Sequence, residues 1–470
     1  MIGLPGSRMA NATRLVAALI ISCASPTFAT HTTAIVGATL IDVANGGRTE
    51  HDLSDAAVVI RDGRIAAVGP AAEVRIPRGA KRIAARGRYL VPGLIDGFGA
   101  VRNARFVAAY LSSGVTSVVV PVAPPGGMVD GETAVADARP LSVLRAQPIG
   151  GYSAIGMLPT SRDWAAFHAR TPPLDDAALR AAVTTAAHKG FRMIALGPDV
   201  APDQLRVLVA AAHAHDLPVS AELAQSRYAD AVAAGVDLVV RNDKYTLSLA
   251  DPAAWQAYAA DPVGPGGRLA SRQLCAGGAA MQDAARAFGA GLGRTGAMPV
   301  LVMEATADDV GAANPWSLPA ARFMRPSDLD DPVDPVTGAR PYLDAHPDRR
   351  EAIRACARAK QGLDRAIHAG GATYFAGTSA PSYGIMPGSG LHEEMRLLTV
   401  IGLTPREALA SATGNYARLF RDRGLIAPGR RADLLLLAAD PRRNVAAIDS
   451  ITLVMVAGQA QADVIALPSE

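Results

Sequence analysis

The chain has 470 residues, half of them hydrophobic and 19% charged, with 45 Gly and 33 Pro spread along it. This composition is typical of a large compact protein with many turns, and it excludes both a disordered chain and a small disulfide-stapled scaffold. The 46 basic and 43 acidic side chains leave a formal net charge of +3. Because the basic residues are scattered, nucleic acid is not expected as a partner.

The first 29 residues have the pattern of a secretory signal peptide. Arg8 and Arg14 precede an apolar run at 15–21, and the segment ends in small residues at Ala29. The run is much shorter than the roughly 20 apolar residues that a membrane span needs, and no later segment is long enough, so we expect no transmembrane segment. We therefore expect a periplasmic or secreted protein, with lipid attachment at Cys23 as a less favoured alternative.

Export would leave two cysteines, Cys275 and Cys356, in the mature chain. In an oxidising compartment they can form one disulfide, but a chain of this size has enough core to fold without it. The sequence leaves both alternatives open, a disulfide or two free thiols.

Residues 34–91 predict short strands separated by tight turns. Asp62 and Gly63 stand between two alternating apolar runs, which predicts a two-residue β-hairpin, because such turns need positive φ at both central positions. The end of the chain has the same texture, with apolar strands expected at 432–439 and 451–456. Two β-rich ends therefore flank a different central region.

In the central region, strand-like and helix-like segments alternate. The clearest segments are the strands expected at 117–122, 193–196, 219–223 and 238–240 and the helices expected at 177–189, 204–215 and 228–234. Continuous apolar strands are what a parallel sheet covered by helices requires, so the pattern predicts a β/α barrel. Residues 244–298 and 311–346 break this rhythm and are expected to be insertions that form lids or rims.

Two motifs near the ends of the central region resemble a known family. Residues 89–96 read Tyr-Leu-Val-Pro-Gly-Leu-Ile-Asp, and residues 424–433 read Gly-Leu-Ile-Ala-Pro-Gly-Arg-Arg-Ala-Asp. Both are similar to signatures of the amidohydrolase superfamily, near its imidazolonepropionase-like and prolidase-like branch. The resemblance implies a TIM-type (β/α)8 barrel at 92–424 and a composite β-sandwich formed by 30–91 and 425–470. It also implies hydrolysis of non-peptide carbon–nitrogen bonds, with zinc or another divalent metal at the carboxyl-terminal mouth of the barrel.

The positions at which this family has metal ligands hold other residues here. Where the family has a His-x-His pair after the first strand, this chain has Phe98 and Ala100, neither of which can bind a metal. The fourth-strand lysine, which the family carbamylates to bridge two metals, aligns with Ala195. The resemblance therefore implies the family fold, but the side chains at these three ligand positions cannot bind a metal.

The remaining positions of the family site have also changed. The histidines of the fifth and sixth strands align with Glu222 and Arg241, and a guanidinium cannot be a ligand and repels a cation. The family's Gly-Thr-Asp, whose aspartate takes the proton of the attacking water, reads Gly-Thr-Ser and ends at Ser379, which is no general base near neutral pH. No metal or other cofactor is therefore predicted. The residues expected to line a ligand pocket are Phe98, Ala100, Ala195, Glu222, Arg241, Glu304 and Ser379.

Two acidic residues and one arginine are the candidates for remaining polar contacts. Glu222 and Arg241 come from neighbouring strands and are expected to form an ion pair. The pair is either structural, which is favoured, or functional, with Arg241 binding a substrate carboxylate. Glu304, expected on the seventh strand, is a weaker candidate at the same mouth.

Among the nine histidines, only His392 lies in a segment expected at the active-site face. It either binds substrate or, as the favoured alternative, caps or orients the helix that follows. His213 and His215 imitate a His-x-His pair, but at the end of a helix residues two apart diverge by about 200°, so both are expected on the surface.

Three functions fit these observations. The favoured one is an exported amidohydrolase homologue that has lost its metal site and acts as a noncatalytic partner of an intact homologue or as a binder of a small molecule. The second is an active hydrolase of a cyclic or peptide-like amide, with a relocated site drawn from Glu222, Ser379 and His392. The third is an interaction protein that docks through residues 326–347. The sequence leaves open whether the chain forms homo- or hetero-oligomers.

Overall fold

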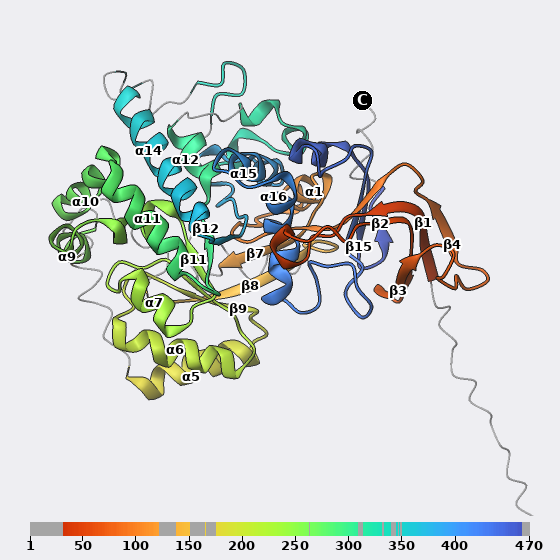
Figure 1. The fold of residues 1–470 in the computed structure, drawn as a ribbon, viewed down its shortest axis with the longest axis horizontal. Coiled ribbons are helices and arrows are strands. Elements are labelled where there is room, and N and C mark those ends of the chain that lie inside the picture. The colour runs from red at the N-terminus through yellow and green to blue at the C-terminus, as the bar shows by residue number, and fades with distance from the viewer. Residues whose placement is uncertain are drawn as a thin grey trace, which may run out of the picture.

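The computed structural model of the chain describes residues 32–121, 138–150, 175–262, 264–308, 314–330, 333–339 and 350–462, with the single residues 165, 345 and 347. The predicted signal peptide lies outside the described residues. These residues form a helix-covered barrel and, beside it, a sheet built from both ends of the chain (Figure 1). No helix in the described ranges is long and apolar enough to cross a membrane.

The barrel contains eight parallel strands that are paired in sequence order. They are β6 (Leu94–Asp96), β7 (Val115–Pro121), β8 (Ser142–Ile149), β9 (Met193–Leu196), β10 (Val219–Ala221), β11 (Leu238–Val240), β12 (Gly296–Met298) and β13 (Thr373–Tyr374). Backbone contacts after the first and last strands close the ring, because Ala100 N donates to Ala380 O at 2.9 Å and Gly97 N donates to Ala376 O at 3.1 Å. The predicted (β/α)8 barrel is confirmed.

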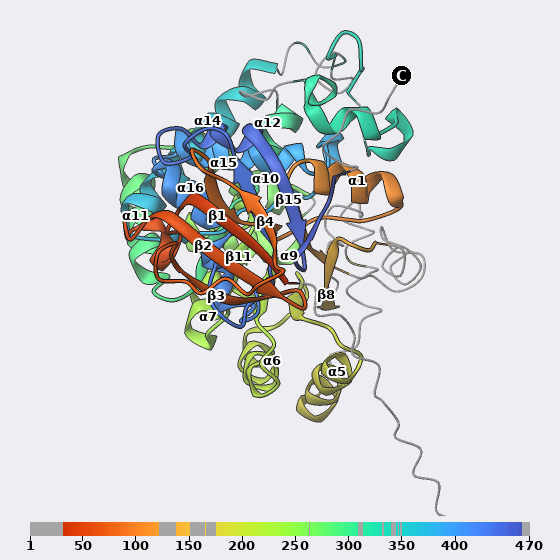
Figure 2. The same ribbon diagram turned by 90° about the vertical axis from the view of Figure 1, so that its right-hand side faces the viewer.

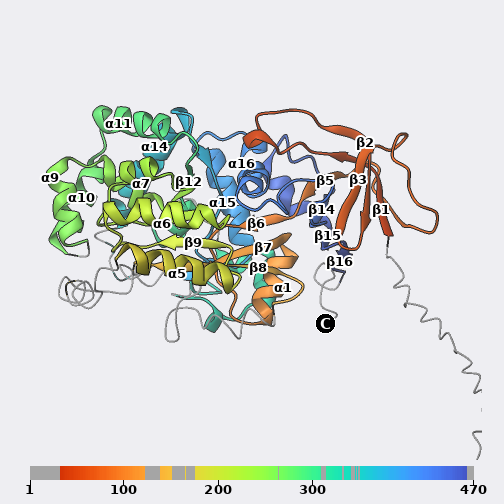
Figure 3. The same ribbon diagram turned by 90° about the horizontal axis from the view of Figure 1, so that it is seen from below.

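Most residues of the barrel strands are apolar and buried, because helices surround the barrel on its outside (Figure 3). The helices are α1 (Ala104–Ser112), α5 (Asp176–His188), α6 (Pro202–Ala214), α7 (Tyr228–Ala234), α8 (Asn242–Tyr245), α9 (Pro252–Ala260), α10 (Pro265–Ala276), α11 (Ala279–Gly291), α12 (Leu301–Asp308), α14 (Arg350–Ala369), α15 (Ser389–Val400) and α16 (Pro405–Ser411). Each central helix that the sequence predicted is present.

The second sheet joins the two ends of the chain. Its strands are β1 (Thr32–Leu40), β2 (Leu53–Arg61), β3 (Arg64–Pro70), β4 (Lys81–Ala84), β5 (Tyr89–Pro92), β14 (Leu434–Leu437), β15 (Ile451–Val456) and β16 (Gln459–Ala460). Figure 2 shows the early strands β1 and β2 and the late strand β15 in the same sheet, in which β14 and β5 lie between them. The central pairing is antiparallel, with Leu90 opposite Leu436 and Val91 opposite Leu435. The two sequence motifs, far apart in the chain, thus meet in one composite domain.

Local signals in this sheet behave as the sequence predicts. Asp62 and Gly63 have φ angles of 50° and 77° and connect β2 to β3, with Arg61 paired to Arg64. Both central residues of the turn are therefore left-handed, as a two-residue hairpin of this type requires.

The first insertion places three helices, α9, α10 and α11, between β11 and β12. The last residues of the predicted 244–298 segment, Gly296–Met298, form β12 itself. The second insertion, 311–346, lies partly outside the described residues. Its described part is held to the barrel by salt bridges, with Arg102 Nη2 2.7 Å from Asp330 Oδ2 and Arg105 bound to Asp328.

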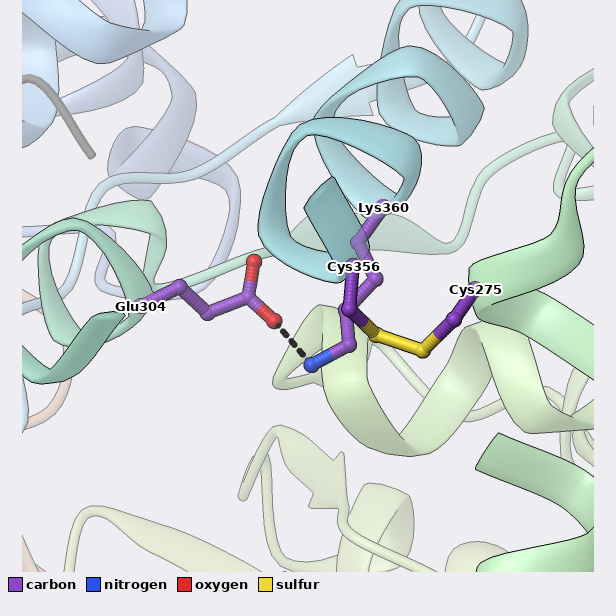
Figure 4. The surroundings of a disulfide bond; sticks show 4 residues. All are labelled: Cys275, Glu304, Cys356 and Lys360. Carbon is purple, nitrogen blue, oxygen red and sulfur yellow. Dashed lines mark hydrogen bonds and ion pairs between the residues drawn. A yellow bond between two sulfur atoms is a disulfide. The ribbon is translucent and has the colours of Figure 1, made fainter. Parts of the chain in front are cut away.

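The two cysteines of the predicted mature chain form a disulfide. Cys275 in α10 is bonded to Cys356 in α14, and their Cα atoms are 4.4 Å apart. Figure 4 shows that Lys360, one helical turn beyond Cys356, extends from the same helix toward Glu304. The disulfide therefore ties the first insertion to the helix that also reaches the barrel mouth.

We expect the disulfide to stabilise the fold by restricting the unfolded chain, since the two cysteines are 81 residues apart. The Cys275→Ser/Cys356→Ser variant should lose about 2–4 kcal/mol of unfolding free energy in guanidinium titrations. A reductant should lower the stability of the wild-type protein similarly and leave the double variant unchanged. Two thiols that react with Ellman's reagent in the denatured, unreduced mature protein would contradict the bond.

Candidate functional site

The carboxyl-terminal ends of the barrel strands place Glu222 and Arg241 side by side. Glu222 directly follows β10, and Arg241 directly follows β11, the neighbouring strand. Arg241 has a φ of 66°, a left-handed backbone that is unusual for a residue with a long side chain. Its backbone N–H donates to Met298 O at 2.7 Å, which fixes this turn against β12. The local backbone is thus shaped to aim the guanidinium at the mouth.

The guanidinium of Arg241 is held by two carboxylates. Its Nη1 donates to Glu222 Oε1 at 3.4 Å, and its Nε and Nη2 donate to the two oxygens of Asp243 at 3.1 and 3.3 Å. Lys244 Nζ lies 3.2 Å from the same Asp243 carboxylate. The predicted pairing of Glu222 with Arg241 is present, and Asp243 adds a second partner.

The charges of this group are stabilised by one another. Burial by itself would lower the pKa of Arg241, but Asp243 and Glu222 outweigh it and raise the pKa above its ordinary value. Burial would likewise raise the pKa of Asp243, but Arg241, Lys244 and Lys360 lower it below its ordinary value. Both groups of the Arg241–Asp243 pair are therefore ionised at neutral pH.

Glu304 reaches the same region from a helix. The sequence predicted it on the seventh barrel strand, which was wrong, because that strand is β12 and Glu304 lies in the following helix α12. Its carboxylate accepts from Asn242 Nδ2 at 2.9 Å and from Lys360 Nζ at 2.7 Å. A short apolar run such as 302–305 is buried both in a core strand and in a core helix. The sequence pattern around Glu304 therefore could not distinguish a strand from a helix.

Asp364 forms the deepest part of this polar network. It is fully buried and accepts three hydrogen bonds, from Tyr245 Oη at 2.5 Å, Tyr374 Oη at 2.8 Å and Asn242 Nδ2 at 3.0 Å. Burial raises the pKa of Asp364 to about 7, although these hydrogen bonds act in the opposite direction. Asp364 therefore changes charge in the neutral range.

Phe98, Ala100 and Ser379 lie where the barrel closes. Ser379 N donates to Phe98 O at 2.6 Å, and the buried Asp96 accepts from Thr378 Oγ1 at 2.7 Å. Burial raises the pKa of Asp96 to about 7, against the hydrogen bonds from Thr378 and Phe98. These contacts join the motif at 89–96 to the Gly-Thr-Ser segment and show a role in closing the barrel.

Ala195 is a buried core residue of β9, with Pro148 of β8 and Ser220 of β10 as its strand partners. Its methyl group offers no polar contact to a ligand.

His392 is occupied away from the Glu222–Arg241 pair. Its Nδ1 lies 2.8 Å from Asp449 Oδ1, and its Nε2 lies 2.8 Å from the carbonyl oxygen of Ser113. Both ring nitrogens are therefore within hydrogen-bond distance of an oxygen acceptor. His392 thus connects α15 to the segment before β15, in agreement with the orienting alternative.

His213 and His215 lie at the opposite, amino-terminal end of the barrel strands. Both line a groove of about 730 Å³, but His213 Nε2 is bound to Asp237 and His215 Nε2 to Thr184. In the parts of the chain with described coordinates, no group of three or more His, Cys, Asp or Glu side chains could hold a metal ion.

Five further residues lie in or near the polar network around Arg241 and were not predicted from the sequence. They are Asp243, Lys244, Lys360, Asp364 and Tyr258. The run Asn-Asp-Lys directly after Arg241 was an available signal for the first two. The others come from α9 and α14, and no local pattern shows that these helices meet the mouth.

Comparison with family models identifies two segments. Residues 345–460 match the amidohydrolase family, and residues 56–75 match the imidazolonepropionase-like composite domain of bacteria. These two segments of the chain are similar to the amidohydrolase family and to its composite domain. Comparison with curated proteins gave no match.

Solved structures with a similar fold match most of the chain. A Xaa-Pro dipeptidase with methionine bound in its active site has 16% identity and a TM-score of 0.58, over 92% of this chain and 99% of its own. The ochratoxinase of A. niger has 18% identity and a TM-score of 0.57, over 92% and 96%. Phenylurea hydrolase B has 19% identity and a TM-score of 0.56, over 93% and 100%. At these identities the likeness shows the fold alone.

The buried acids of this chain should make its stability depend on pH. Burial raises the pKa of Asp96 and Asp364 to about 7 and that of Glu394 to about 8. Between about pH 4 and 8 the folded state therefore binds more protons than the unfolded state, and stability falls as pH rises. We expect a melting temperature at pH 5.5 that exceeds the one at pH 8.5 by roughly 2–5 °C.

The Asp364→Asn variant imitates the protonated acid and should show a weaker pH dependence over this range. Asp334→Asn is the control, because Asp334 is exposed and its pKa is lowered, so this carboxylate does not titrate above pH 4. A melting temperature that rises steadily from pH 5.5 to 8.5 would contradict the raised pKa values.

Proposed function

We propose that this chain is an exported, noncatalytic binding protein of the amidohydrolase superfamily, which takes a small molecule at a barrel mouth without a catalytic metal. The observation on which this rests is the guanidinium of Arg241, held between Glu222 and Asp243 where the family resemblance implies a metal ligand. A fixed positive charge at that position disfavours a divalent cation and favours a ligand with a negative group.

The residues at the implied ligand positions do not fit a divalent metal. Zinc and related ions are bound by His, Cys, Asp and Glu side chains. Phe98, Ala100 and Ala195 have no donor atom in their side chains, and Glu222 is bonded to the guanidinium. A cation placed against the remaining oxygen of Glu222 would face the charge of Arg241 directly.

The alternative of a relocated hydrolytic site is not favoured by the geometry. As a base for Ser379, His392 would need a free ring nitrogen, but its Nδ1 and Nε2 each lie 2.8 Å from another acceptor, Asp449 Oδ1 and the carbonyl oxygen of Ser113. A base needs a free nitrogen within hydrogen-bond reach of the nucleophile.

Metal content is the direct test of this proposal. We expect elemental mass spectrometry of untagged mature protein, loaded with zinc or manganese and then desalted, to find well below one ion per chain. A zinc enzyme handled in the same way is the positive control. No hydrolysis of dipeptides or cyclic amides should appear with or without added metal. About one tightly bound ion per chain, or metal-dependent turnover, would overturn the proposal.

Export is the second part of the proposal. It is supported by the signal pattern at 1–29 and by the disulfide between Cys275 and Cys356, because such bonds persist mainly in oxidising compartments. We expect intact-mass analysis to find a mature chain that begins at Thr30 in the periplasmic or extracellular fraction. A variant that lacks residues 2–29 should stay in the cytoplasm. A full-length wild-type chain in the cytoplasm would contradict export.

A further inference from the structure

The guanidinium of Arg241 has capacity for another partner. Of the five N–H donors that an arginine carries, three are used by Glu222 and Asp243. The side chain keeps 15% of its surface exposed, so it is not sealed off from solvent. The two remaining N–H groups have no acceptor within the described part of the chain and are available to a ligand.

Two buried oxygen atoms near this guanidinium lack hydrogen-bond partners among the residues that the structure describes. They are Oε2 of Glu222, whose side chain is only 3% exposed, and Oη of Tyr258, which is 1% exposed. Tyr258 comes from α9 in the first insertion, and the charges of Asp243, Glu222 and Arg241 all act on it. A buried oxygen without a partner is destabilising, so both atoms are better satisfied by a ligand that donates hydrogen bonds.

The charge balance restricts what this ligand can be. Below pH 7, where Asp364 is protonated, Arg241 and Lys244 are matched by Glu222 and Asp243, and Lys360 is matched by Glu304. A simple anion or cation would leave this buried group with an unbalanced charge, which is unfavourable at low dielectric. A ligand that carries one positive and one negative group leaves the balance unchanged.

We propose that Arg241, Glu222 and Tyr258 bind the zwitterionic head of a free α-amino acid. The carboxylate accepts from the two available N–H groups of Arg241, and the ammonium group donates to Oε2 of Glu222 and to the hydroxyl of Tyr258. This inference rests on the proposed function, since it names the class of small molecule that the metal-free mouth takes.

The closeness of the two charged groups favours an α-amino acid over a longer zwitterion. Nη1 of Arg241 and Oε1 of Glu222 are 3.4 Å apart, so the available donors and acceptors belong to adjacent side chains. In an α-amino acid the ammonium and carboxylate are attached to the same carbon atom. In a dipeptide a peptide unit separates the ammonium from the carboxylate. The two groups are then too far apart to contact the adjacent side chains of Arg241 and Glu222 in the same way.

The test is calorimetric titration of the desalted, full mature protein with each of the twenty L-amino acids. We expect binding of at least one of them. For the amino acid that binds most tightly, the matched probes are the same compound without its amino group and the same compound without its carboxylate. Both should bind at least 10-fold more weakly, and so should its dipeptide with glycine.

Three variants assign the contacts. Tyr258→Phe removes only a hydroxyl group without a hydrogen-bond partner, so it should fold normally and weaken binding about 3–10-fold. The double variant Arg241→Gln/Glu222→Gln removes the ion pair without a change in net charge and should abolish measurable binding. Arg421→Gln is the matched control, because the side chain of Arg421 is 86% exposed at the other end of the barrel. It should bind as the wild type does.

Two results would overturn the inference. One is the absence of binding by all twenty amino acids to folded protein. The other is equal affinity for the amino acid and for its analogue without the amino group, which would indicate a simple carboxylate site. Either result leaves the metal-free mouth untouched, whereas a stoichiometric metal ion would overturn the proposed function whatever the amino acids do.

Discussion

A positive charge buried at the end of a barrel strand has to be neutralised, and this requirement organises the mouth of the barrel. Arg241 is placed there by an unusual left-handed backbone, and its guanidinium cannot lose a proton. Glu222 from the neighbouring strand and Asp243 from the following turn supply the negative charge. Removing either acid alone would leave an uncompensated charge in a poorly solvated place, which is far more costly than never having formed the pair.

The same requirement links the insertion helices to the barrel. Asn242, next to Arg241 in sequence, donates to both Glu304 and Asp364, and Lys360 of α14 completes the group by pairing with Glu304. Cys356 lies one turn before Lys360 and is bonded to α10. The mouth is thus defined by helices that the disulfide holds together as much as by the strand ends. A change in the position of α14 would alter the electrostatic surroundings of Asp243 without any change in the strands.

The fold was accessible from the sequence, because its signals are local or belong to continuous motifs. The alternating strands and helices at 193–240 and the turn at Asp62 and Gly63 each appear in the structure where the sequence predicts them. The pairing of Glu222 with Arg241 was also accessible, since both follow adjacent strands. The contacts of Tyr258, Lys360 and Asp364 were not, because helix periodicity shows which face is buried but not which distant polar group that face meets. Glu304 was assigned to a strand instead of a helix for a related reason. The apolar run around it, 302–305, is too short to distinguish a strand from a helix.

The two parts of the family pattern are separable in physical terms. The motifs at 89–96 and 424–433 maintain the fold: the strands that they lead into pair in the composite sheet, and Asp96 holds the closing turn through Thr378. These contacts join backbone and side-chain atoms of the chain itself. They therefore do not depend on which residues occupy the family's metal-ligand positions. A divalent metal can both hold an anionic group and turn a bound water into a nucleophile. A guanidinium can do only the first, because it has no open coordination position and no proton to give up near neutral pH. On the proposed function, replacing a metal ligand by Arg241 therefore keeps the capacity to bind a negatively charged group and removes the means to generate a nucleophile.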